Sequence, residues 1–347
     1  MPRVALYDDP IYRDHDAGAG HPERPERADA AVRGVEAAGL ASRVERVTPR
    51  DATATEILRV HTEEHLSEVA GSDGTMRRFD PDTQAGPRSY RAALRAAGAA
   101  IDAIDEILDG VFDRAFCIVR PPGHHAGADR AMGFCLFNNV AIAAAHALAQ
   151  GLERVMIVDF DVHHGNGTQD IFADDPRVLY VSSHAYPFYP GTGALEEVGE
   201  GRGEGFTVNL PLPPGMGDAE YARLYREIVL PIGRAFDPQL VLVSAGYDAA
   251  RGDPLAYMDV TAVGFGEMSS ACVDIAEGAA RGRVVLLLEG GYGLEQIASG
   301  VAASVRALLG DGRATPVERH EDARFERIFA ASRDFHARRW PVLSRRR

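Results

Sequence analysis

Five short runs of apolar residues, each followed at once by a polar cluster, constrain this chain more than any other feature of its sequence. The runs are rich in Val, Ile and Leu and cover residues 117–119, 155–158, 178–181, 240–243 and 284–288. Runs of this kind are typical of strands buried on both faces of a parallel sheet. Ligands of open α/β sheets bind beyond the carboxyl ends of the strands. We therefore expect polar residues scattered from position 124 to position 292 to meet in one cleft.

Helix-like stretches alternate with these runs along the 347 residues. Further strands are expected at 3–7 and 206–210, and helices at 25–39, 54–60, 90–108, 139–150, 167–173, 218–236, 261–280 and 294–309. The alternation favours one α/β domain over residues 1–347, with a central, mainly parallel sheet flanked by helices. The Gly- and Asp-rich stretch 71–88 is expected to be a surface loop. The charged segment 311–347 is expected at the periphery, with a helix near 325–336.

Charge and cysteine content limit the partners of the chain. The net charge of −14 argues against a nucleic-acid partner, because binding to phosphates requires a basic surface. This charge is compatible with steering of a cationic substrate, but solubility alone is the simpler explanation. All 37 basic residues are Arg, and the three cysteines Cys117, Cys135 and Cys272 form no CxxC pair. With no signal-peptide core and no apolar stretch of about 20 residues, we expect a cytoplasmic protein without a membrane partner. A homo-oligomer is compatible with the sequence.

The best candidates for metal ligands are Asp161, His163 and Asp248. In Asp-x-His after a strand, residues i and i+2 lie on the same side of an extended backbone, so both can bind one ion. Asp248 follows another expected strand in the same way. Three protein ligands with one open position are the pattern of a catalytic zinc site. Taken alone, the Asp could instead cap a helix and the His could make a core hydrogen bond, but the tandem histidines elsewhere favour a metal site.

His124 and His125 follow Arg-Pro-Pro-Gly and could share acid and base work if their surroundings separate their pKa values. Asp159 and Asn166 are natural partners for their ring nitrogens: a carboxylate adds basicity, whereas an amide only fixes orientation. Tyr292 lies in Gly-Gly-Tyr-Gly, a turn that could aim the phenol at a tetrahedral oxyanion. Each of these motifs, taken singly, also occurs in purely structural roles.

Aromatic residues on two motif loops could form a narrow slot for an alkyl chain. Phe134 lies in Gly133-Phe134-Cys135, and Tyr189 lies in Phe188-Tyr189-Pro190. The same rings could instead pin the loops to the core.

Together these motifs resemble the histone deacetylase and acetylpolyamine amidohydrolase family, whose members have the arginase-like α/β fold. The resemblance runs from His21-Pro22-Glu23-Arg24-Pro25 to Gly290-Gly291-Tyr292 and so covers most of the chain. Three features are similar to the class II branch: the segments 120–125 and 133–139, and Asn166, where class I members usually have Asp.

The resemblance implies a role for each motif. It implies one zinc ion at Asp161, His163 and Asp248. His124, paired with Asp159, would act mainly through its charge. His125, next to Asn166, would be the general base and then the acid, and Tyr292 would polarise the acyl carbonyl. The resemblance also implies a structural K⁺ or Na⁺ ion held by Asp159, Ser182, Ser183 and the backbone carbonyls of Asp161 and His163.

The resemblance further assigns the substrate contacts. Gly133, Phe134 and Tyr189 would line an acyl-lysine tunnel, although the family usually has Phe at the position of Tyr189. Asp82 is our candidate for the loop Asp that fixes the substrate backbone. Leu255 stands where polyamine-specific members can carry Glu, which favours an acyl-lysine peptide or a less selective substrate. Gly293 stands where the family commonly has Asn. Neither this departure nor the one at Tyr189 removes a catalytic group.

The leading hypothesis is therefore a zinc-dependent amidohydrolase that removes acetyl or another short acyl group from lysine side chains. An acetylpolyamine amidohydrolase with the same chemistry is the nearest alternative. A binuclear ureohydrolase would need an Asp-x-Asp after the last site strand, but Asp248 is followed by Ala249 and Ala250. A weakly active acyl-lysine binding protein is a further alternative, which the presence of Tyr292 and His125 disfavours.

Overall fold

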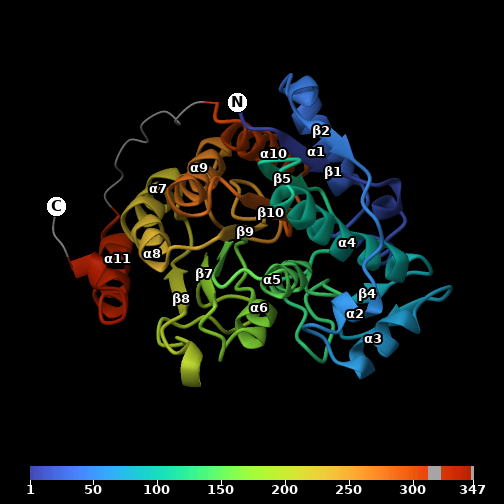
Figure 1. Cartoon of the computed structure of the whole chain (residues 1–347), viewed down its shortest axis with the longest axis horizontal. Helices are drawn as coiled ribbons and strands as arrows, with labels where there is room; N and C mark the ends of the chain where they lie inside the picture. Colours follow the sequence, from blue (N-terminus) through green and yellow to red (C-terminus); the bar gives the residue numbers. More distant parts are fainter. Residues whose placement is uncertain (312–321, 345–347) are drawn as a thin grey trace.

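Eight parallel strands form one sheet in the computed structural model, which describes residues 1–311 and 322–344. The strand order is β2-β1-β5-β10-β9-β6-β7-β8 (Figure 1). The strands are β1 (Val4–Tyr7), β2 (Glu45–Val47), β5 (Arg114–Cys117), β6 (Val155–Asp159), β7 (Val178–Ala185), β8 (Thr207–Leu212), β9 (Leu240–Ala245) and β10 (Val284–Leu288). Every neighbouring pair among them is parallel, so the predicted parallel sheet is confirmed.

Helices cover both faces of this sheet, which explains why its inner strands β5, β10, β9 and β6 are buried along their whole length. Along β10, Val284 and Leu286 belong to one core and Val285 and Leu287 to the other. Helices α1, α7, α8, α9 and α10 pack on the first core, and α4 and α5 on the second (Figure 1). Their bounds are Glu26–Ala37 (α1), Ser89–Leu108 (α4), Asn139–Ala149 (α5), Asp218–Leu224 (α7), Leu230–Phe236 (α8), Ala262–Ala279 (α9) and Leu294–Leu308 (α10). Three further helices are α2 (Ala54–Ile57), α3 (Glu63–Ala70) and α6 (Asn166–Ile171).

Three local features differ from the sequence-based expectation. The expected helix 218–236 contains a π-helical turn, Tyr225–Val229, between α7 and α8. Pro231 lies in the first turn of α8 and has no N–H to donate to a carbonyl of the preceding turn. The wider π-helical turn lets the chain continue without this backbone hydrogen bond. The expected loop 71–88 includes a two-stranded antiparallel pair, β3 (Arg77–Arg78) and β4 (Gln84–Ala85). The edge strand β2 was not expected, because it has only three, mostly exposed residues.

The segment 311–347 falls partly outside the described residues, at 312–321 and 345–347. Its described part forms helix α11 (Ala323–His336) and a 3₁₀ turn, Pro341–Ser344. Phe325 and Phe329 of this helix are buried in the first core. The Trp340 indole N–H donates to the carbonyl of Gly205 at 3.1 Å. The described part therefore packs against the body of the protein. Within the two described ranges, none of the helices is both long and apolar enough to cross a membrane.

Gly34 allows α1 to pack directly against α10. A Cβ at this position would overlap the backbone oxygen and carbonyl carbon of Ala298, which cannot move aside as a flexible side chain would. We expect Gly34→Ala to lower the free energy of unfolding by roughly 1–3 kcal/mol, measured by urea denaturation. Gly278→Ala in α9 is the control, because the nearest atom there is an Arg234 side-chain nitrogen at 3.8 Å. An unchanged midpoint in Gly34→Ala would contradict this close helix contact.

Candidate metal centre and active site

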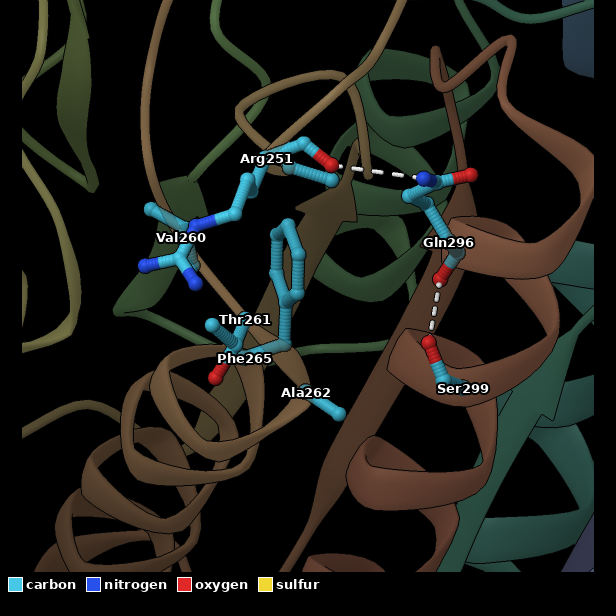
Figure 2. Close-up of a pocket in the computed structure, with 8 residues that line it drawn as sticks. Arg251, Val260, Thr261, Ala262, Phe265, Gln296 and Ser299 are labelled. Atoms are coloured by element: carbon cyan, nitrogen blue, oxygen red, sulfur yellow. Dashed lines mark hydrogen bonds between the residues drawn. The ribbon is translucent and has the colours of Figure 1, made fainter.

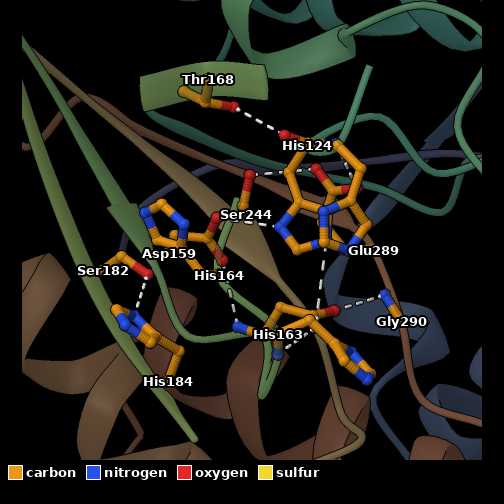
Figure 3. A network of polar contacts seen from close by, with 12 residues as sticks. His124, Asp159, His163, His164, Thr168, Ser182, His184, Ser244, Glu289 and Gly290 are labelled. Atoms are coloured by element: carbon orange, nitrogen blue, oxygen red, sulfur yellow. Dashed lines mark hydrogen bonds and ion pairs between the residues drawn. The ribbon is translucent and has the colours of Figure 1, made fainter. Parts of the chain in front are cut away.

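Four neighbouring strands bring the predicted site residues to one edge of the sheet. In spatial order these strands are β5, β10, β9 and β6. His124 and His125 follow β5, Tyr292 follows β10, Asp248 follows β9, and Asp161 and His163 follow β6. Figure 3 shows His124, Asp159 and His163 in one polar network with Glu289 and Gly290. The carboxyl ends of these strands thus bring together the polar residues that the sequence predicts to meet.

Asp161, His163 and Asp248 form a buried cluster of one imidazole and two carboxylates. Their candidate ligand atoms all lie within 4.8 Å of one another. His163 Nδ1 is 3.0 Å from Asp161 Oδ1 and 3.1 Å from Asp248 Oδ2. A Cβ at Gly246 or Gly290 would overlap these carboxylates, so two glycines leave the space that the acidic groups occupy.

The charge of this cluster fits a divalent cation. Burial and the neighbouring charge of Asp161 raise the pKa of Asp248 to about 7. Burial disfavours protonation of His163. The negative charges of Asp248 and Asp161 outweigh this effect and raise the pKa of His163 to about 10. Two buried carboxylates therefore require positive charge between them. The set of one nitrogen and two oxygen donors is one that zinc accepts at catalytic sites.

The two tandem histidines have opposite electrostatic surroundings. His124 Nδ1 lies 3.0 Å from Asp159 Oδ2. Burial opposes its protonation, but the charges of Asp159 and Asp161 raise its pKa to about 10. Burial lowers the pKa of His125 well below its usual value, and the nearby positive charges of His124 and His163 lower it further.

The ring orientation of His125 follows from its partner. His125 Nδ1 donates to the Asn166 side-chain oxygen at 2.9 Å. Because the neutral ring carries its proton on Nδ1, Nε2 keeps a lone pair that can accept a proton. The ring centroids of His124 and His125 are 4.0 Å apart. Their opposite pKa shifts favour a cationic His124 beside a neutral His125, an arrangement suited to acid–base chemistry.

Aromatic rings from separate loops surround these histidines. Phe134 meets Tyr292 edge to face, with centroids 5.9 Å apart, and Tyr189 meets His125 in the same way at 5.2 Å. Gly133 has a positive φ of 57°, and a Cβ there would overlap the His125 ring. A side chain at position 133 would thus displace the ring of His125.

The two more remote substrate candidates lie on loops that touch this site. Asp82 is half-buried, and its backbone carbonyl accepts from His21 Nε2 at 3.2 Å. Burial raises the pKa of Tyr189, and the charge of Asp82 raises it further. The hydroxyl of the neighbouring Thr83 accepts the backbone N–H of Phe134 at 3.1 Å, which joins this loop to the aromatic residues of the site. Leu255 is half-buried, and its N–H donates to Asp253 Oδ1 at 2.9 Å.

The residues predicted for a monovalent ion are neighbours in the sheet. Asp159 of β6 is the register partner of Ser182 of β7. The Asp159 carboxylate accepts from the backbone N–H of Asp161 and from the hydroxyl of Tyr180. The hydroxyl of Ser183 lies 3.0 Å from that of Tyr225.

Glu289 is a site residue that the sequence reasoning missed. Its buried Oε2 accepts the backbone N–H groups of Gly123 and His124, at 2.6 and 3.2 Å, and Oε1 accepts from the Ser244 hydroxyl at 3.0 Å. The next residue, Gly290, donates its N–H to Asp161 at 2.8 Å (Figure 3). Glu289 thus joins the turn that carries His124 to the end of β10. Its place directly after an apolar run was the signal that could have identified it.

Comparisons with known proteins show the family to which this chain belongs. A family model described as a histone deacetylase domain matches residues 21–308. Histone deacetylase 15 of Arabidopsis thaliana is 45% identical over 84% of this chain and 53% of its own length. A probable deacetylase of Archaeoglobus fulgidus is 43% identical, over 82% of this chain and 80% of its own length. Polyamine deacetylase HDAC10 of Homo sapiens is also 43% identical, over 83% of this chain and 45% of its own length.

The fold of a solved relative is similar over nearly its whole length. The crystal structure of the HDA15 HD domain superposes with a TM-score of 0.93 at 40% identity, covering 99% of this chain and 98% of that one. The chain spans about half the length of the plant and human relatives above. On the family match and these identities, the chain belongs to the histone deacetylase family.

Proposed function

We propose that this protein is a zinc-dependent amidohydrolase that removes acetyl or other short acyl groups from acylated lysine side chains. The observation that carries the proposal is the buried cluster of Asp161, His163 and Asp248 beside the His124–His125 pair. Family membership supports the same reaction class. A zinc ion held by the three ligands would polarise the acyl carbonyl and acidify a water molecule.

The side chains around that centre would supply the proton transfers. His125, neutral with a free lone pair on Nε2, would take a proton from the attacking water and return it to the leaving amine. His124, kept protonated by Asp159, would offset negative charge that develops nearby. Burial raises the pKa of Tyr292 well above its ordinary value, so the phenol keeps its proton and can donate it in a hydrogen bond to the oxyanion.

Supporting groups would fix the substrate and the scaffold. Gly133, Phe134 and Tyr189 would line the path of the acyl-lysine chain, and Asp82 would hold the substrate backbone. A K⁺ or Na⁺ ion at Asp159, Ser182 and Ser183 would be structural. The three cysteines are free and buried, which supports a reducing compartment such as the cytoplasm.

Acetylpolyamine hydrolysis is the second candidate, because one relative is named a polyamine deacetylase. Leu255 favours the lysine peptide, since an apolar side chain cannot pair with the distant ammonium of a polyamine. The deciding experiment compares hydrolysis of an acetyl-lysine peptide, longer acyl-lysine peptides and acetylputrescine, with zinc content measured on the same sample. About one zinc per chain with peptide hydrolysis supports the proposal. Zinc without turnover on any substrate would point to a binding protein.

Leu255→Glu is expected to shift this preference toward acetylputrescine. A new carboxylate could pair with the free ammonium, and a half-exposed pair of this kind contributes about 1 kcal/mol, or roughly fivefold in relative kcat/KM. The ratio of kcat/KM for acetylputrescine and acetyl-lysine peptide measures the effect. Leu255→Gln is the control of equal size without charge, and it should leave the ratio close to that of the wild type. An equal shift in both variants would contradict the charge argument.

A further inference from the structure

The turn that carries Tyr292 has little conformational restraint of its own. It is the sequence Gly290-Gly291-Tyr292-Gly293, and Gly291 has a φ of 109°, which side-chain-bearing residues rarely adopt. Gly293 is the N-cap of α10 and has no side chain to cap the helix. A phenol that must donate to one atom needs a fixed backbone. The restraint must therefore come from another part of the chain.

Asp253, in the loop after β9, supplies the part of that restraint that acts on Tyr292 and Gly293. Its buried Oδ2 accepts the backbone N–H of Tyr292 at 2.7 Å and that of Gly293 at 3.0 Å. A carboxylate at this place also lies at the positive end of the α10 dipole. Asp253 thus accepts, from 40 residues away, the N-cap N–H that an N3 side chain accepts in a capping box.

The same carboxylate holds the loop that carries Leu255. Asp253 Oδ1 accepts the N–H of Leu255 at 2.9 Å, so one side chain joins Leu255 to the turn of Tyr292. Gln296 makes a second link between this loop and α10, because its side-chain amide donates to the carbonyl of Arg251 at 3.3 Å. Figure 2 shows this link at the edge of a small pocket of about 210 Å³. Of these two links, the one made by Asp253 includes a hydrogen bond to the backbone of Tyr292, whereas the one made by Gln296 joins α10 to Arg251.

We infer that Asp253 is a positioning residue, which orients the Tyr292 hydroxyl for the reaction and couples this orientation to the Leu255 loop. The inference rests on the proposed amidohydrolase function. Loss of the carboxylate would release two N–H groups and let the glycine-rich turn move. Because a misplacement of about 1 Å in a catalytic group costs on the order of 100-fold in rate, the effect falls on kcat.

The test compares Asp253→Ala and Asp253→Asn with the wild type on an acetyl-lysine peptide. We expect kcat to fall on the order of 10- to 100-fold in Asp253→Ala, less in Asp253→Asn, with zinc content unchanged. In a Tyr292→Phe background, Asp253→Ala should cause little further loss of kcat, because no hydroxyl remains to be oriented. An equal loss of kcat in both backgrounds would overturn the inference.

Two controls separate positioning from general stability. Asp218→Ala removes a comparable carboxylate, which accepts the Thr261 N–H at 2.7 Å at the start of α9, and should lower stability without lowering kcat. Gln296→Ala removes the second loop link and should also keep kcat. Hydrogen–deuterium exchange should rise at 290–296 in Asp253→Ala alone. Unchanged exchange at this turn would show that Asp253 does not restrain it. This result can be obtained even if the wild type hydrolyses none of the substrates tested, so failure of the inference is distinguishable from failure of the proposed function.

Discussion

Asp248→Asn is expected to abolish amide hydrolysis and to remove the thermal stabilisation that zinc provides. The substitution is nearly isosteric. An Asn oxygen can still accept the Val162 N–H, which Asp248 Oδ1 accepts at 2.9 Å. The oxygen 3.1 Å from His163 Nδ1 would become an NH₂ group, which cannot bind a cation. The variant should therefore fold and lose one of three candidate ligands.

Zinc content and melting temperature measure this prediction directly. A ligand that binds only the native state at about 100 times its Kd stabilises that state by about 2.7 kcal/mol. We expect such a zinc-dependent rise in melting temperature for the wild type and its loss in Asp248→Asn. Chelation should inactivate the wild type reversibly. Asp218→Asn, whose carboxylate lies at the start of α9, should keep both zinc and activity. One zinc per chain and normal turnover in Asp248→Asn would exclude Asp248 as a ligand.

The sequence predicted the strands and the polar residues after them because both signals are local. An apolar run marks a buried strand, and an Asp or His directly after it must lie at the end of that strand. The order of the strands is not a local property. β5, β9 and β10 are all fully buried, and β10 lies between the other two although it is last along the chain. The sequence could therefore predict a shared cleft without predicting which strands are neighbours.

Supporting residues were harder to predict than the groups they support. Glu289 accepts N–H groups from residues 166 and 165 positions away, and Asp253 accepts from residues 39 and 40 positions away. Any exposed turn could supply such donors, so no spacing in the sequence indicates these bonds. Asp161 and His163, in contrast, are two residues apart in one motif. The predictable part of the site was thus the set of polar residues that directly follow a strand, whereas the contacts of supporting residues depend on the tertiary fold.

Tyr292→Phe is expected to keep zinc and stability and to lose most of the turnover. The ring would remain in place, because its neighbours contact the aromatic face and edge rather than the hydroxyl. Phe134 packs edge to face at 5.9 Å, and the Arg27 guanidinium lies 5.0 Å from the ring centroid. The Arg27 side chain also donates to the carbonyl of Gly291 and so holds the same turn. The variant therefore isolates the hydroxyl.

The expected loss follows from the role of that hydroxyl. Burial raises the pKa of Tyr292, so the group remains a neutral donor across the working pH range. Removing one donor to an oxyanion costs on the order of 100- to 1000-fold in kcat. Because the bond forms mainly in the transition state, KM should change little. Single-turnover rates on an acetyl-lysine peptide, with zinc content as the control, measure this split. Near-normal kcat in a zinc-loaded Tyr292→Phe variant would show that another group stabilises the oxyanion, and it would also remove the basis for Asp253 as a positioning residue.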